Sequence, residues 1–265
     1  MIISSAQNPR VKHLKKLRNR RSRDKSRQVL VEGYRELLRA IEFGYPIDEI
    51  YCCPELFIGE NEPQLIRRGK DAGASVIELT APLFRKVAYR DRPEGLIGLG
   101  PQVHRRLDEL VLGKNPLIVV VEAVEKPGNL GTILRSADAT GVDGIIICDA
   151  CTDLFNPNVV RASTGALFSV PVAEADAEST VGWLSEQGIR TLAATPHTDR
   201  LYTEEDMQNP TAIVVGTEQY GLSKFWMEHA DRQVRIPMLG RIDSLNVATA
   251  TTLLLYEAVR QRGLK

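Results

Sequence analysis

The feature that most constrains the fold is a pair of continuous apolar runs in the second half of the chain, each followed by a helical pattern. Residues 117–122 (LIVVVE) and 144–149 (GIIICD) are apolar at every position but the last, which is typical of strands buried on both faces of a parallel sheet. The alternation continues with strands expected at 169–172, 191–195 and 212–216, and helices at 129–140, 159–164, 179–187 and 248–262. This pattern predicts the α/β class with a doubly wound parallel sheet.

A smaller α/β unit is expected before this domain. Its pattern indicates strands at 29–32, 47–52 and 75–79 and helices at 33–43 and 62–72. Residues 101–115 combine proline, glycine and charge, which is typical of a linker. The predicted domains are therefore 1–100 and 116–265, joined by the linker 101–115.

The composition is that of an ordinary globular protein. Of 265 residues, 43% are hydrophobic and 26% are charged. The sequence has no apolar run of about 18 residues, so no membrane-spanning helix is expected, and the N-terminus lacks the apolar core of a signal peptide. Four cysteines in a chain of this size favour a reducing compartment, and we expect a cytoplasmic protein.

The formal net charge of zero hides a basic block near the N-terminus. Residues 10–27 hold ten Lys and Arg against one acid, Asp24. Such a block favours a polyanionic partner such as RNA, while the alternative is a solvated helix face or a frayed tail. We expect one short basic helix over 9–24, in which Leu14, Leu17 and Asn19 interrupt the charges too little for it to pack. The candidate RNA-binding residues are Arg10, Lys12, Lys15, Lys16, Arg18, Arg20 and Arg21.

Three loops in the second half carry candidate site residues. Residues 126–135 (KPGNLGTILR) form a glycine turn between a strand and a helix, with neither G-x-G-x-x-G nor G-K-[ST]. Residues 214–223 (VVGTEQYGLS) place Glu218 after a strand, and residues 236–248 (IPMLGRIDSLNVA) lead into the last helix, whose N-terminus can hold a polar ligand. Singly, the first two are also compatible with an ordinary turn and a solvated glutamate. Together the three indicate a site.

These loops carry a resemblance to a known family. Asn129, Gly131 and Arg135 match the first motif of the SpoU family of RNA ribose methyltransferases, in the SPOUT superfamily. The second motif matches Gly216, Glu218 and Gly221, with Gln219 where many members have glycine, and the third matches 236–238 and 244–248. Residues 161–172 resemble the family's linking stretch, and residues 1–100 its ribosomal-protein-like RNA-binding domain.

The resemblance implies a deep trefoil knot at the C-terminus, S-adenosylmethionine bound in the knot loops, no metal, and a homodimer. Carried over by position, the cofactor-binding residues would be Thr195, Gly216, Ile236, Met238 and Leu245. The catalytic residues would be Asn129, Arg135, Glu218, Ser244 and Asn246. The family assigns the motif-one arginine as the base, but a guanidinium with a pKa above about 12 is better suited to anchoring phosphate and stabilising an oxyanion.

The expected function is transfer of a methyl group from S-adenosylmethionine to a ribose 2′-hydroxyl, in ribosomal RNA rather than tRNA, because a separate N-terminal domain suits a structured RNA. The alternatives are a tRNA ribose methyltransferase and a non-catalytic RNA-binding protein on the same scaffold. Cys148-x-x-Cys151 follows a strand as a thioredoxin-like motif would, although structural thiols are the other interpretation.

Overall fold

The computed structural model describes residues 2–263, which divide into two units. The N-terminal unit comprises Met1–Val103 and Asp153–Ser169, and the C-terminal unit comprises His104–Thr152 and Val170–Lys265. The segment 153–169 therefore packs with the N-terminal unit, whereas the sequence placed it in the C-terminal domain. The boundary after Val103 lies inside the predicted linker.

The N-terminal unit contains a five-stranded mixed sheet in the order β1-β4-β3-β5-β2. Its strands are β1 (Ile2–Ile3), β2 (Gln28–Glu32), β3 (Glu49–Cys52), β4 (Ser75–Leu79) and β5 (Leu96–Pro101). Its helices are α1 (Pro9–Lys16), α2 (Arg20–Ser26), α3 (Tyr34–Glu42), α4 (Glu62–Asp71), α5 (Ala81–Val87), α7 (Pro157–Ser163) and α8 (Ala166–Ser169), with a short 3-10 turn at Pro54–Leu56. Strand β5 runs antiparallel to both β2 and β3, and the other pairings are parallel.

The basic block was predicted wrongly as one unpacked helix. It forms two helices, α1 and α2, and Val11, Leu14 and Leu17 are fully buried in the core against β3, β4 and α5. Their i, i+3, i+6 spacing gives one apolar edge, which is enough to anchor a helix whose other faces are charged. In α2 the side chain of Arg23 is also buried, where it pairs with Asp153 and donates to the carbonyls of Leu17 and Arg18.

The C-terminal unit contains a six-stranded, entirely parallel sheet in the order β11-β9-β10-β6-β7-β8. The strands are β6 (Leu117–Glu122), β7 (Gly144–Cys148), β8 (Val172–Ala175), β9 (Arg190–Ala194), β10 (Thr211–Val215) and β11 (Arg232–Val234). The helices are α6 (Pro127–Thr140), α9 (Ala177–Glu186), α10 (Lys224–His229) and α11 (Val247–Arg262), with 3-10 turns at Leu107–Glu109 and Tyr202–Glu204.

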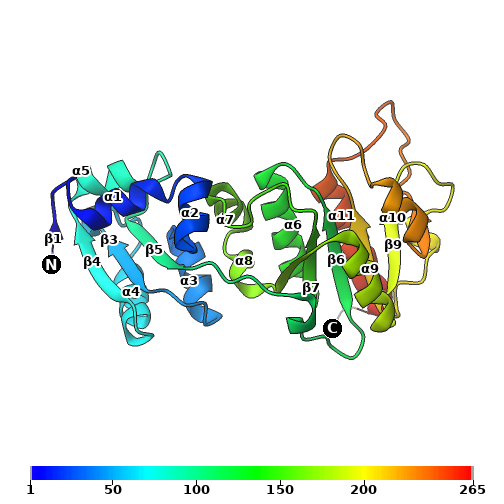
Figure 1. The fold of residues 1–265 in the computed structure, drawn as a ribbon, viewed down its shortest axis with the longest axis horizontal. Coiled ribbons are helices and arrows are strands. Elements are labelled where there is room, and N and C mark those ends of the chain that lie inside the picture. The colour runs from blue at the N-terminus through cyan, green and yellow to red at the C-terminus, as the bar shows by residue number, and fades with distance from the viewer. Residues whose placement is uncertain (1, 264–265) are drawn as a thin grey trace. The chain divides into compact units, whose positions relative to one another are not determined.

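Helices cover both faces of this sheet, which confirms the doubly wound prediction. Alternate strand residues such as Ile118, Val120 and Val214 pack with Leu184 of α9 and Trp226 of α10. On the opposite face α6 and α11 pack against each other (Figure 1), and α11 also contacts β10. The predicted strand at 169–172 is wrong: Ser169 ends α8, and β8 begins only at Val172.

The last helix is integral to the C-terminal unit. Ala248, Leu254, Leu255 and Ala258 of α11 are buried, and the hydroxyls of Ser136 in α6 and Thr252 in α11 hydrogen-bond at 2.6 Å. The trefoil knot implied by the resemblance stays a prediction. Over residues 2–263, no helix has the length and apolar character needed to cross a membrane.

Candidate active site

The candidate site lies where the strand order of the C-terminal sheet reverses. From β6 the chain proceeds through β7 and β8 to one edge, whereas β10, β9 and β11 occupy the other side of β6. Since β6 and β10 are parallel neighbours, the loops that leave their carboxyl ends emerge together. These are the segment 123–126 before α6 and the segment 216–223 before α10.

A tight turn after β10 presents Glu218. The N–H of Thr217 donates to the carbonyl of Gly221 at 2.9 Å, and the N–H of Gly221 returns a bond of 3.1 Å. The carboxylate of Glu218 accepts from the N–H groups of Glu125 and Lys126, both at 3.1 Å. The loop after β10 is therefore tied directly to the loop after β6.

Two asparagines extend this connection to the third loop. The Nδ2 of Asn129, in the first turn of α6, donates to Glu218 Oε1 at 2.7 Å. Its Oδ1 accepts from Nδ2 of Asn246 at 3.0 Å, and Oδ1 of Asn246 caps α11 by accepting from the N–H of Ala248 at 3.0 Å. One chain of hydrogen bonds thus joins all three motif loops, across residues far apart in sequence.

The charge of Glu218 is stabilised by this chain. Burial raises the pKa of the Glu218 carboxyl, but the hydrogen bonds from Glu125, Asn129 and Lys126 together outweigh burial and lower the pKa below its ordinary value. An ionised Glu218 can only accept hydrogen bonds, so it fixes Asn129 with its amide nitrogen toward Glu218 and its oxygen toward Asn246.

Glu122, at the end of β6, was not singled out from the sequence. Its side chain is buried, and Oε2 accepts from the N–H of Ser223 at 2.8 Å, which holds the far end of the 216–223 loop. The available signal was an acidic residue closing an otherwise apolar strand. Such a carboxylate is costly to bury without a partner.

Arg135 and Ser244 are not joined to this chain. Arg135 is exposed on α6, one residue before the Ser136–Thr252 bond, and Ser244 is exposed in the loop before α11. Within residues 2–263 neither side chain has a hydrogen-bond or ion-pair partner among the contacts found. Both are therefore free to meet a ligand from solvent.

The residues expected to hold a cofactor lie at strand ends and in the last loop. Gly216 follows β10, and a Cβ built there would come within 2.3 Å of the Gly221 backbone, so only glycine fits. Thr195 follows β9, is buried, and donates its N–H to the carbonyl of Val234 at 2.9 Å. Ile236, Met238 and Leu245 are half-buried in the segment 236–246.

The backbone of the segment 236–246 is open to a ligand. In the part of the chain that the structure describes, none of its N–H groups donates a hydrogen bond within the protein. Leu239 and Ile242 on the same segment are 98% and 63% exposed. Exposed apolar side chains beside unpaired backbone groups are suited to a ligand with both polar and apolar parts.

Gln219 does not disturb the turn. Outside glycine, the described residues with positive φ are Arg27, Ala123, Asp149 and Thr164, so Gln219 occupies ordinary backbone space that any side chain can adopt. The departure from the family pattern is therefore compatible with the hydrogen bonds of Glu218.

The seven candidate RNA-binding residues are all exposed on the N-terminal unit. Some carry local contacts: Arg10 pairs with Glu49 at 3.4 Å, Arg20 pairs with Asp24 at 3.6 Å, and Arg18 donates to the carbonyl of Ala88. The remaining four are Lys12, Lys15, Lys16 and Arg21.

The cysteine pair has the character of structural thiols. Burial raises the pKa of Cys148 to about 12, although Thr180 lies within hydrogen-bond distance and lowers it. A thiol with such a pKa has almost no thiolate at neutral pH. Cys151 is exposed and donates weakly to the carbonyl of Asp149.

Comparison with known proteins decides the family. Residues 116–256 match the model of the SpoU rRNA Methylase family. The chain belongs to the SpoU family. Residues 8–98 match a second model, the MRM3-like substrate binding domain, so both halves of this SpoU protein have counterparts among known domains.

Relatives of this SpoU protein match over nearly its full length. A 23S rRNA (uridine(2479)-2′-O)-methyltransferase of Streptomyces viridochromogenes is 32% identical over 93% of this chain and 87% of its own. The 23S rRNA (guanosine(2553)-2′-O)-methyltransferase RlmP of Bacillus subtilis is 28% identical over 96% and 97%.

Solved structures separate into two kinds. An S-adenosylmethionine-bound rRNA methyltransferase from Sinorhizobium meliloti has a TM-score of 0.89 at 31% identity and covers 98% of this chain and 97% of its own. The TrmH/SpoU tRNA-modifying enzyme of A. aeolicus has a TM-score of 0.50 at 30% identity, over 58% of this chain and 78% of its own.

Proposed function

We propose that this protein transfers the methyl group of S-adenosylmethionine to a ribose 2′-hydroxyl of ribosomal RNA. The observation that carries the proposal is the hydrogen-bonded chain Glu218–Asn129–Asn246, which links the three family motifs into one site. Relatives with 2′-O-methyltransferase activity match over the full length of the chain. A non-catalytic RNA-binding scaffold would not require this buried polar linkage.

The residues present fit the cofactor. Gly216 keeps the turn after β10 free of any side chain where backbone groups converge, and the segment 236–246 offers unpaired N–H groups beside apolar side chains. Thr195, Ile236, Met238 and Leu245 would complete the enclosure. When bound, the cofactor supplies a sulfonium-activated methyl group, so the proposal assigns no step to a metal ion.

The protein's own residues would then position the RNA. A ribose hydroxyl is a weak nucleophile, and most of the catalysis can come from holding it in line with the methyl carbon. We assign Arg135 to the phosphate next to this ribose and to the charge that develops on the 2′-oxygen, since its guanidinium stays protonated. Asn246 and Ser244 lie on the neighbouring loop and would hydrogen-bond the ribose.

The same proposal names rRNA before tRNA and a homodimer before a monomer. The match to a tRNA-modifying structure stops at 58% of the chain, whereas the rRNA enzymes match both units. Leu253 and Tyr256 of α11 are 38% and 49% exposed in the single chain, although an apolar pattern predicted both to be buried. A second copy of the protein packed on α11 would cover them.

The test is methyl transfer from tritiated S-adenosylmethionine to two unmodified transcripts, a bacterial 23S rRNA and a tRNA. We expect label in the 23S rRNA alone, and nuclease digestion followed by mass spectrometry should find it in a 2′-O-methylnucleoside. Label on a base, or in tRNA alone, would contradict the proposal, and binding of RNA without any transfer would favour the scaffold.

A further inference from the structure

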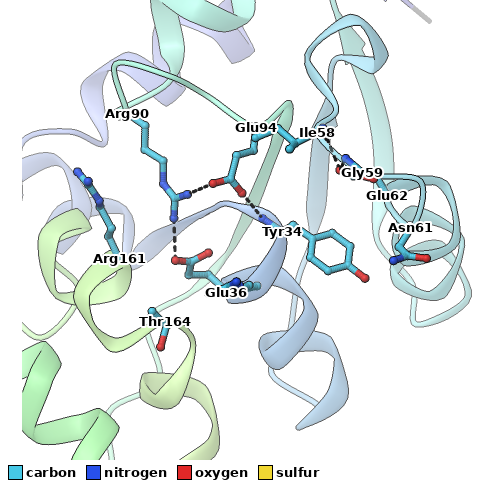
Figure 2. Close-up of a pocket in the computed structure, with 11 residues that line it drawn as sticks. Tyr34, Glu36, Ile58, Gly59, Asn61, Glu62, Arg90, Glu94, Arg161 and Thr164 are labelled. Atoms are coloured by element: carbon cyan, nitrogen blue, oxygen red, sulfur yellow. Dashed lines mark hydrogen bonds and ion pairs between the residues drawn. The ribbon is translucent and has the colours of Figure 1, made fainter.

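The N-terminal unit contains a cavity of about 460 Å³ to which no role has been assigned above. Its walls come from the start of α3, the loop before α4, the loop that precedes β5, and α7. All of these belong to one compact unit. Figure 2 shows Arg161 and Thr164 on one side of the cavity and Tyr34 and Asn61 on the other.

The centre of the cavity is a preformed ion-pair network. Arg90 donates from Nη2 to Glu36 at 2.7 Å and from Nη1 to Glu94. Glu94 also accepts from the N–H of Tyr34 at 3.2 Å, and Glu32 accepts from the N–H of Arg90 at 3.0 Å. These bonds hold the loop that precedes β5 against the start of α3, so the walls are fixed before any ligand arrives.

Charges are sorted by depth in this cavity. Glu36 and Glu62 are buried, whereas Arg35 and Arg161 are exposed at its rim. A ligand that fits must carry its negative charge outward, toward the two arginines, and its hydrogen-bonding groups inward. Free phosphate would meet the buried carboxylates and is therefore disfavoured.

The walls also offer surfaces for a flat apolar group. The ring of Tyr34 is only half-buried, and Ile58 is 77% exposed at the cavity edge. Beside them Asn61 presents an amide that can both donate and accept. An aromatic face, an aliphatic face and a polar edge are what single-stranded RNA binding uses to hold a base.

Two polar atoms of the walls are unsatisfied. Nε of Arg90 and Oε2 of Glu62 are buried and have no hydrogen-bond partner within residues 2–263, and Glu62 is only 3% exposed. Its other oxygen accepts from the N–H of Gly59 at 2.8 Å. Buried polar atoms are nearly always paired, so these two point to a ligand or water that completes the cavity.

We propose that this cavity binds one unpaired nucleotide of the substrate RNA, with its base against Tyr34 and Ile58 and its phosphates at Arg35 and Arg161. The inference rests on the proposed function, because it names how that substrate is recognised. Arg161 and Thr164 come from the segment that links β7 to β8 of the catalytic sheet. The catalytic domain's own sequence therefore contributes to the recognition site.

The test measures binding of the full chain to three probes by fluorescence anisotropy or NMR. The probes are a 12-nucleotide single-stranded oligoribonucleotide of mixed sequence, the same strand paired with its complement, and the four nucleoside monophosphates. Tyr34→Ala should weaken single-strand binding by about 5- to 100-fold, since base stacking contributes that much. Tyr34→Phe should restore it, and duplex binding should be equal in all three proteins.

Arg161→Ala should weaken single-strand binding and reduce the salt dependence of its logarithm by about one unit per phosphate lost. The matched control is Arg67→Ala, an exposed arginine of α4 outside the cavity, which should leave affinity near that of the wild-type protein. Circular dichroism melting of each variant separates loss of binding from loss of folding.

Three results would overturn the inference: unchanged single-strand affinity in folded Tyr34→Ala and Arg161→Ala, equal losses for duplex and single strand, or binding of the monophosphates alone. The first two leave methyl transfer by the wild-type protein unaffected. A wild-type protein that binds the single strand through Tyr34 but transfers no methyl group would instead contradict the proposed function.

Discussion

At the scale of single residues, the site depends on the directions of a few hydrogen bonds rather than on proximity alone. Asn129 satisfies a carboxylate with its nitrogen and an asparagine with its oxygen. Neither aspartate nor leucine of similar size could do both. The motif loops could be predicted from the sequence, but the pairing of Asn129 with Asn246 could not, because it joins positions 117 residues apart.

Glu218→Gln should destabilise the C-terminal unit by about 1 kcal/mol at pH 7, because the amide cannot accept from both the Glu125 N–H and the Lys126 N–H. Since hydrogen bonding lowers the folded-state pKa of Glu218, its stabilisation is present above the unfolded pKa and lost as pH falls through the folded pKa. The difference between variant and wild type should therefore shrink below about pH 4.

Urea unfolding followed by tryptophan fluorescence measures this difference. Both tryptophans, Trp183 and Trp226, lie in the C-terminal unit, so the signal reports that unit. The control is Glu186→Gln, an exposed glutamate of α9. A Glu218→Gln effect that stayed constant from pH 7 to pH 4 would argue against the ionised, hydrogen-bonded carboxylate.

Gly216→Ala should weaken S-adenosylmethionine binding by about 5- to 100-fold, because the new Cβ must displace the Gly221 backbone and overpacking of this kind costs about 1–3 kcal/mol. Isothermal titration calorimetry measures the affinity. Gly182→Ala in α9 is the control, because nothing lies within 4 Å of its Cβ. Normal cofactor binding by Gly216→Ala would remove this turn from the cofactor site.

At the scale of elements, strands were easier to predict than the contacts of loops and short helices. The strands at 75–79 and 117–122 have the predicted bounds because their apolar patterns are uninterrupted. Strand β5 was missed, since Gly98 and Gly100 weaken its pattern. Both glycines are required by close neighbours, at Leu37 and at the carbonyl of Pro46. The packing of α7 on β2 has no local signal.

Asp153→Ala should destabilise the N-terminal unit by about 3–5 kcal/mol, because Arg23 would remain buried without its partner. The side chains of this pair are 2% and 8% exposed. Differential scanning calorimetry measures the loss.

The matched control is Asp24→Ala, which breaks the exposed Arg20–Asp24 pair and should cost less than about 1 kcal/mol. The double substitution Arg23→Met with Asp153→Leu should recover much of the stability, as apolar replacement of buried ion pairs does. A single-variant cost no greater than the control's would mean that this ion pair does not anchor the segment 153–169.

At the scale of the whole molecule, the account predicts a dimer through α11. Leu253→Lys with Tyr256→Lys should convert a dimer to a monomer in analytical ultracentrifugation while the tryptophan signal of the folded unit is kept. Val111→Lys is the control, since Val111 is 86% exposed in the same unit but far from α11 in sequence. A wild-type monomer, or a dimer in both variants, would contradict this interface.

The most direct test of the central claim separates the RNA side of the site from the cofactor side in one protein. We predict that Arg135→Ala binds S-adenosylmethionine as the wild type does in calorimetry, yet transfers methyl groups to 23S rRNA at least about 100-fold more slowly, the usual cost of losing one group that stabilises an oxyanion. Arg232→Ala, another exposed arginine of the same unit, should behave as wild type in both assays. Near-normal transfer by Arg135→Ala would contradict the account, as would loss of cofactor affinity.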